Sequence, residues 1–71
     1  MITERDKDVF NAIKIFININ GYSPTVREIA KMLDITSPAT VQAHINKLKD
    51  KRYITLVPNM NRTIRILKEC E

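Results

Sequence analysis

The chain has 71 residues, of which 44% are hydrophobic and 28% are charged. This is the composition of a globular domain and not of a disordered segment, and a chain of this length forms one small core with little room for an elaborate catalytic site. The net charge is +4, and it is unevenly placed: residues 1–36 carry five basic and five acidic side chains, whereas residues 37–71 carry seven and three. This asymmetry favours a polyanionic partner on one side of the domain; the alternative is an ordinary solvated face.

Export and membrane insertion are both disfavoured. No apolar run approaches the roughly 20 residues that a membrane-spanning helix needs, and the N-terminal residues include no apolar signal region. The single cysteine, Cys70, cannot form an internal disulfide, which fits a reducing compartment. We therefore expect a cytoplasmic protein.

A first helix is predicted between Thr3, whose side chain can cap it, and Gly21, which can adopt the left-handed conformation that ends many helices. Ile15 and Ile19 lie off its apolar arc. We expect these two to cover the edge of a sheet, with a dimer contact as the alternative. At about 100° per residue, the main apolar arc contains Val9, Phe10, Ile13, Phe16 and Ile17.

Two further helix starts follow close together. Thr25-Val26-Arg27-Glu28 has the form of a capping box and begins a short helix of about 26–33. Ser37 is then the expected N-cap, and Pro38 the first residue, of a helix of about 38–51. The three residues 34–36 leave room only for a tight turn. This is the helix-turn-helix arrangement, whose second helix enters the DNA major groove.

A hairpin is predicted at the end of the chain. Residues 53–57 are rich in β-branched and aromatic side chains, the segment from Pro58 through Asn59 to Asn61 is a turn cluster, and residues 62–67 alternate polar with apolar. A hairpin after a helix-turn-helix is a wing. The predicted fold is therefore a single domain over residues 1–71, mainly α with a small antiparallel β-hairpin, of the winged helix-turn-helix type with three helices.

The third predicted helix has two contrasting faces. Ile45 and Leu48 fall within about 40° of Val41, and the three form a core stripe. The opposite face is small and polar, as a helix must be to lie against base edges: amides can pair with adenine, and methyl groups can contact thymine. The residues predicted to contact bases are Ser37, Ala39, Thr40, Gln42, Ala43 and Asn46.

Contacts to the DNA backbone are predicted from the surrounding polar and basic residues. Such contacts give salt-dependent affinity without sequence preference. The alternative for the helix lysines is compensation of the helix dipole, and for the hairpin arginines a solvated strand face. The predicted set is Thr25, Arg27, Lys47, Lys49, Arg52, Arg62 and Arg65.

The sequence contains no recognisable catalytic or metal-binding motif. Gly21 is the only glycine, so there is no glycine-rich phosphate loop, and no nucleophile–base pair or metal-ligand spacing is visible. His44 lies beside the core stripe, where we expect a partly buried structural role. We expect no enzymatic activity, no cofactor and no small-molecule substrate.

Two dense motifs, in the right order and separation, carry a family resemblance. The segments 21–30 (GYSPTVREIA) and 37–45 (SPATVQAHI) resemble the N-terminal domain of LexA repressors. The sequence around Thr40, Val41 and His44 is closest to that of the Gram-positive members. The similarity extends over nearly the whole chain, from Ile2-Thr3-Glu4-Arg5 to the Arg-x-Ile-x-Ile-Leu pattern of residues 62–67.

The resemblance implies a repressor domain that binds a double-stranded operator through its third helix, typically at DNA-damage (SOS response) genes. Family contacts come from the N-terminal half of that helix, which matches Ser37, Ala39, Thr40, Gln42 and Ala43 here. Enterobacterial members have Asn and Glu where this chain has Ala39 and Gln42, so the resemblance does not fix the operator sequence. A palindromic site bound by a weak homodimer would follow from two-fold symmetry.

LexA proteins continue into a dimerising domain with a Ser–Lys self-cleavage site, which is lacking in these 71 residues. The chain is expected to be either one domain of a longer repressor or a short stand-alone relative. The competing function is a winged-helix protein–protein adaptor that does not use DNA. Ile15 and Ile19 favour the adaptor, and the basic second half argues against it.

Overall fold

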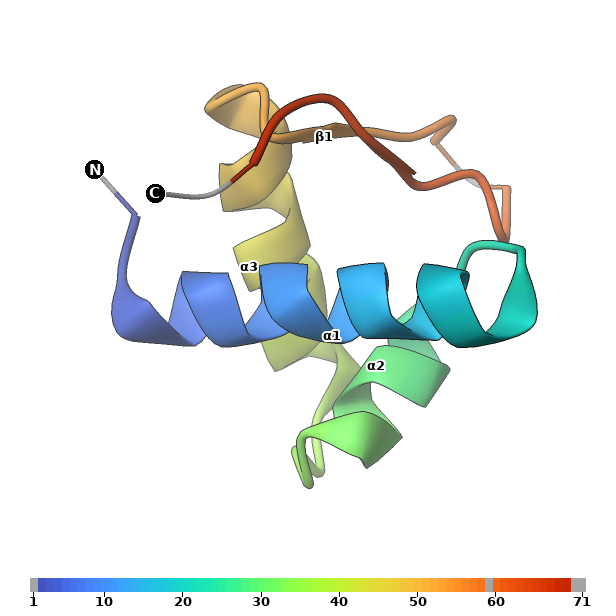
Figure 1. The fold of residues 1–71 in the computed structure, drawn as a ribbon. Coiled ribbons are helices and arrows are strands. Elements are labelled where there is room, and N and C mark those ends of the chain that lie inside the picture. Colours follow the sequence, from blue (N-terminus) through green and yellow to red (C-terminus); the bar gives the residue numbers. More distant parts are fainter. Residues whose placement is uncertain (1, 59, 70–71) are drawn as a thin grey trace.

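In a computed structural model of the chain, three helices pack against one another and a two-stranded hairpin closes the core (Figure 1). The structure describes residues 2–58 and 60–69, so the expectations for Asn59 and Cys70 fall outside the described residues. The helices are α1 (Glu4–Asn20), α2 (Val26–Met32) and α3 (Pro38–Asp50), and the strands are β1 (Ile54–Thr55) and β2 (Arg65–Ile66). The predicted class, mainly helical with a small antiparallel hairpin, is confirmed.

The first two helices begin with complete capping boxes. At α1 the Thr3 hydroxyl accepts a hydrogen bond from the Asp6 N–H, and the Asp6 carboxylate accepts one from the Thr3 N–H. Thr25 and Glu28 make the same reciprocal pair at α2. The box at α2 was predicted, whereas the one at α1 was predicted only as a Thr3 cap. Both boxes satisfy backbone donors that the first helical turn cannot.

The helix ends use left-handed residues. Gly21 ends α1 at φ 78°, as predicted, and the tight turn after α2 places Asp34 at φ 56°. The Asp34 and Ile35 N–H groups return to carbonyls of the last turn of α2, which is the Schellman pattern. Asp tolerates this conformation better than most residues, so a turn without glycine still forms. Although Ser37 is the N-cap residue of α3, its hydroxyl does not accept the expected hydrogen bond from the first turn of the helix.

The core lies where α1, α2, α3 and β1 meet. Its buried apolar residues come from every predicted stripe, but Phe16 and Ile17 at the end of α1 are only half-buried. Ile15 and Ile19 are 50% and 76% exposed, and Ile15 lies beside Met32 of α2, so the expectation that they cover the sheet edge is wrong. The core consists of Val9, Phe10, Ala12, Ile13, Ile29, Ala30, Val41, Ile45, Leu48, Ile54 and Ile64.

The hairpin is much shorter than the predicted strands. Among residues 2–58 and 60–69, the pairs in register are Ile54–Ile66 and Thr55–Arg65. Pro58 carries no N–H for a ladder, and Arg62 turns the chain at φ 59°, so regular pairing cannot extend to the tip. Thr63 partly replaces it, since its hydroxyl accepts from the Val57 N–H at 2.9 Å.

Candidate nucleic-acid interface

The outer face of α3 is directed away from the protein. Val41, Ile45 and Leu48 are at most 1% exposed and fix the opposite face against the core. Because this stripe sets the rotation of the helix, the predicted base-contacting residues all lie outside the core: Gln42 is half-buried, and the exposed ones are Ser37, Ala39, Thr40, Ala43 and Asn46.

Gln42 and Asn46 are not independent side chains. The Gln42 Nε2 donates to the Asn46 Oδ1 at 3.0 Å, one helical turn away. This bond orients both amides and leaves the Gln42 Oε1 as an acceptor and the Asn46 Nδ2 as a donor for other partners. An acceptor beside a donor is the arrangement that a base edge in the major groove can match.

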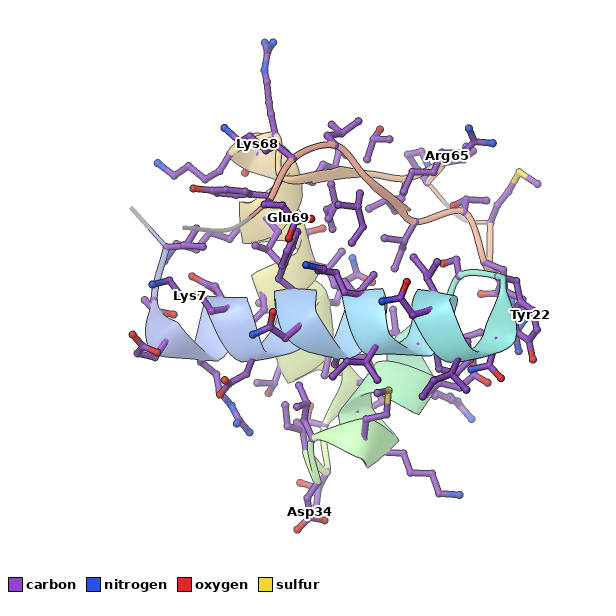
Figure 2. The ribbon with its side chains drawn as sticks, in the orientation of Figure 1. Lys7, Tyr22, Asp34, Arg65, Lys68 and Glu69 are labelled. Carbon is purple, nitrogen blue, oxygen red and sulfur yellow. The ribbon has the colours of Figure 1, made fainter. Side chains whose placement is uncertain are left out.

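A groove of about 360 Å³ runs between α3 and the hairpin. Gln42, Asn46 and Lys49 line it from α3, and Asn61 and Arg62 line it from the hairpin. Figure 2 shows Arg65 on the hairpin, at the opposite end of the molecule from Asp34 in the turn between α2 and α3. The residues that line the groove show that the hairpin and the outer face of α3 flank one polar, partly basic channel.

The basic residues predicted to contact the DNA backbone fall into two groups, and of them Lys49 and Arg62 line this channel. Arg27, Lys49, Arg52 and Arg65 are exposed, and none has an ion pair within the described residues 2–58 and 60–69. The other group already has carboxylate partners: Lys47 with Asp6 and Arg62 with Glu28.

Asp6, in the first turn of α1, contacts two residues of α3, His44 and Lys47. It is 1% exposed, and its Oδ1 lies 2.7 Å from the Nδ1 of His44 and its Oδ2 lies 3.2 Å from the Nζ of Lys47. The partly buried role predicted for His44 is confirmed, but its partner was missed. Burial by itself would raise the pKa of Asp6. Hydrogen bonds from the Thr3 backbone, His44 and Lys47 outweigh burial and hold that pKa well below its usual range.

Glu28 holds the hairpin in a similar way. The Arg62 Nη2 donates to the Glu28 Oε2 at 3.2 Å, and the Arg62 Nη1 donates to the Ser23 carbonyl at 3.0 Å. The guanidinium lies 4.8 Å from the centroid of the Tyr22 ring. The backbone hydrogen bond from Thr25 and the bond from Arg62 lower the pKa of Glu28. Arg62 therefore fastens the hairpin to the segment between α1 and α2. The Ile64 N–H, which donates to the Ser23 hydroxyl at 3.1 Å, adds a second fastening.

Over residues 2–58 and 60–69, no three His, Cys, Asp or Glu side chains come close enough together to hold a metal ion. In the same part of the chain, none of the helices combines the length and the apolar character that spanning a bilayer demands.

Comparison with known proteins identifies the family. The model of the LexA DNA binding domain matches residues 1–63. Similar proteins include the LexA repressor of Bacillus thuringiensis (strain Al Hakam), at 38% identity, and that of Staphylococcus aureus (strain Mu3 / ATCC 700698), at 35%; each match covers 96% of this chain. The chain spans about a third of the length of these relatives, since each match covers 33% of theirs. With its winged helix-turn-helix fold and its outward-facing third helix, the chain belongs to the LexA DNA-binding domain family.

Proposed function

We propose that the domain binds double-stranded DNA in a sequence-specific manner, as the DNA-reading part of a LexA-like transcriptional repressor. The observation that carries this proposal is the outer face of α3, which is small, polar and exposed beside a basic channel. The relatives are named LexA repressors. We propose that this domain acts as part of such a repressor, at genes of the SOS response. The role is one of binding, without catalysis.

In the proposed complex α3 lies in the major groove. Its N-terminal end approaches a phosphate, and the Ser37 hydroxyl, which makes no cap bond, is available as a donor. The methyl groups of Ala39, Thr40 and Ala43 pack against thymine methyls, and Gln42 and Asn46 present their amides to a base edge.

The DNA backbone lies along the channel between α3 and the hairpin. Lys49, Arg65, Arg52 and Arg27 supply the charge, because their cationic groups are not already engaged by carboxylates in the described residues. Thr25, Lys47 and Arg62 were predicted in the same role. Each has an internal partner, so a contact to phosphate would compete with that partner.

A two-fold pair of domains would place two α3 helices in successive major grooves, about 34–36 Å apart, on a palindromic operator.

The exposed Ile15 beside Met32 supports the second candidate, a protein–protein adaptor, because an apolar pair at the surface suits a protein contact.

The test begins with selection of bound duplexes from a random pool. Mobility-shift titrations then compare the selected duplex with a scrambled one at two salt concentrations. We expect a palindromic selected site and a specific affinity well above the scrambled one. A protein that enriches no sequence and binds neither duplex at low salt would be an adaptor instead.

We predict that Gln42→Ala or Asn46→Ala reduces discrimination between the two duplexes by about 1–3 kcal/mol per lost bidentate contact. The double variant should lose less than the sum of the two, because the residues share a hydrogen bond. Asn18→Ala, an exposed amide on α1, is the matched control and should change nothing. Unchanged discrimination in either single variant would remove that residue from the readers.

A further inference from the structure

We propose that Asp6 is a positioning residue for DNA recognition. It fixes α3 to α1 through His44, and it engages the Lys47 ammonium so that Lys47 does not serve as a phosphate contact. This inference rests on the proposed function. It concerns a buried residue in the first turn of α1, away from the outer face of α3.

The geometry makes one carboxylate the meeting point of two helices. The Asp6 Oδ2 accepts from the Thr3 N–H at 2.8 Å and from the Lys47 Nζ at 3.2 Å, while the Oδ1 accepts from the His44 Nδ1 at 2.7 Å. His44 and Lys47 are one turn apart on α3, and between them lies Asn46, a proposed base reader. The carboxylate therefore restrains α3 at the turn that carries a reader.

The chemistry of the site requires a carboxylate. With the pKa of Asp6 lowered, both oxygens are acceptors, and together they serve three donors in a position with almost no access to water. An asparagine would replace one acceptor with an NH₂ donor and would remove the charge that Lys47 faces. Either His44 or Lys47 would then lose its partner, and the group that loses it would move toward another partner or toward water.

Two measurable consequences follow for DNA binding. If Asp6 sets the placement of α3, its loss lowers the preference for the selected operator. If Asp6 holds Lys47, its loss frees an ammonium whose side chain is already 41% exposed, and the salt dependence of binding to any duplex becomes steeper. A residue that merely stabilised the fold would produce no gain in salt dependence.

The central experiment compares Asp6→Asn with Asp8→Asn. Both variants remove one acidic charge from α1, but Asp8 is exposed and pairs only with Arg5, at 3.5 Å, among the described residues 2–58 and 60–69. We expect Asp6→Asn to lower the ratio of operator to scrambled affinity about tenfold, comparable to one lost bidentate contact. Its salt slope on scrambled duplex should steepen by about 0.9 per domain, while Asp8→Asn keeps the wild-type ratio and slope.

Variants on α3 test the same idea without altering Asp6. They are needed if circular dichroism shows that Asp6→Asn does not fold. Lys47→Met should leave the salt slope unchanged, because its ammonium does not serve a phosphate. His44→Asn places a donor near the position of the Nδ1 and should keep the operator preference, whereas His44→Leu should lose it.

The outcomes separate the two proposals. A wild-type protein that binds no duplex contradicts the proposed function and this inference together. A wild-type protein that prefers its operator leaves the function intact, and the inference then fails on any of three results. These are a folded Asp6→Asn variant with unchanged ratio and slope, a Lys47→Met variant whose slope flattens by about 0.9, and equal preferences in the two His44 variants.

Discussion

The two capping boxes of this domain share a motif and differ in what surrounds it. In each, a threonine N-cap and an acid three residues later satisfy each other's backbone N–H. In each, that acid also binds a cation from an element that we propose faces DNA: Asp6 binds Lys47 of α3, and Glu28 binds Arg62 of the hairpin. Asp6, however, is 1% exposed, whereas the Glu28 side chain is 35% exposed.

Burial decides how much each acid stabilises. Water screens the Glu28–Arg62 pair, and exposed pairs contribute little. A buried carboxylate that loses its partners, or leaves them unpaired, costs far more. The same local motif therefore serves as a strong anchor for a helix with a core stripe, and as a weak one for a hairpin whose strands have only two residues each. The following predictions test this contrast.

Asp6→Ala should have the largest effect. It removes one side of a capping box and leaves His44 and Lys47 without their carboxylate, so we expect the free energy of unfolding to fall by about 3 kcal/mol. Urea denaturation followed by circular dichroism measures this. Asp8→Ala, on the same helix, should stay within about 0.5 kcal/mol of wild type. Equal losses in the two variants would show that Asp6 is no anchor.

The acid dependence of stability should divide between the two boxes. Both acids have lowered pKa values in the folded state, so their contributions are complete above the unfolded values of about 3.9 for Asp and 4.3 for Glu, and are lost as the pH falls below them. Between pH 5 and pH 2 the Asp6→Asn variant should therefore lose less stability than wild type. The Glu28→Gln variant should show a smaller change in the same direction. Urea titrations at each pH would contradict the contrast if Glu28→Gln flattened the curve more.

Arg62→Met should have the smallest global effect and a clear local one. It removes the donors to Glu28 and to the Ser23 carbonyl, so the hairpin should open more often while the core stays intact. Hydrogen exchange of the Ile64 N–H, which is bonded to the Ser23 hydroxyl, reports this opening. Exchange should quicken in Arg62→Met and not in Arg65→Met, an exposed arginine of β2. Identical exchange in both would mean that Arg62 does not fasten the hairpin.

Features that depend on near neighbours in the chain could be predicted from the sequence. The capping box at Thr25, the left-handed Gly21 and the core stripe of α3 each involve residues within a few positions, and the structure confirms all three. Predictions that needed a distant surface were less accurate. The strands are shorter in the structure than predicted. Ile15 and Ile19 are exposed, contrary to prediction, because what covers a residue depends on where other elements pack.

Hydrogen bonds and side-chain spacing within one or two turns settle the helices, their N-cap residues and the residues that α3 turns outward, so these could be predicted from the sequence. Which cations remain available for the proposed DNA contacts depends on tertiary packing. Asp6 and His44 are 38 positions apart, and Glu28 and Arg62 are 34 apart, so no local pattern pairs them. Packing brings each acid to its partners, and that packing divides the basic residues into those that hold the fold together and those available for the proposed phosphate contacts.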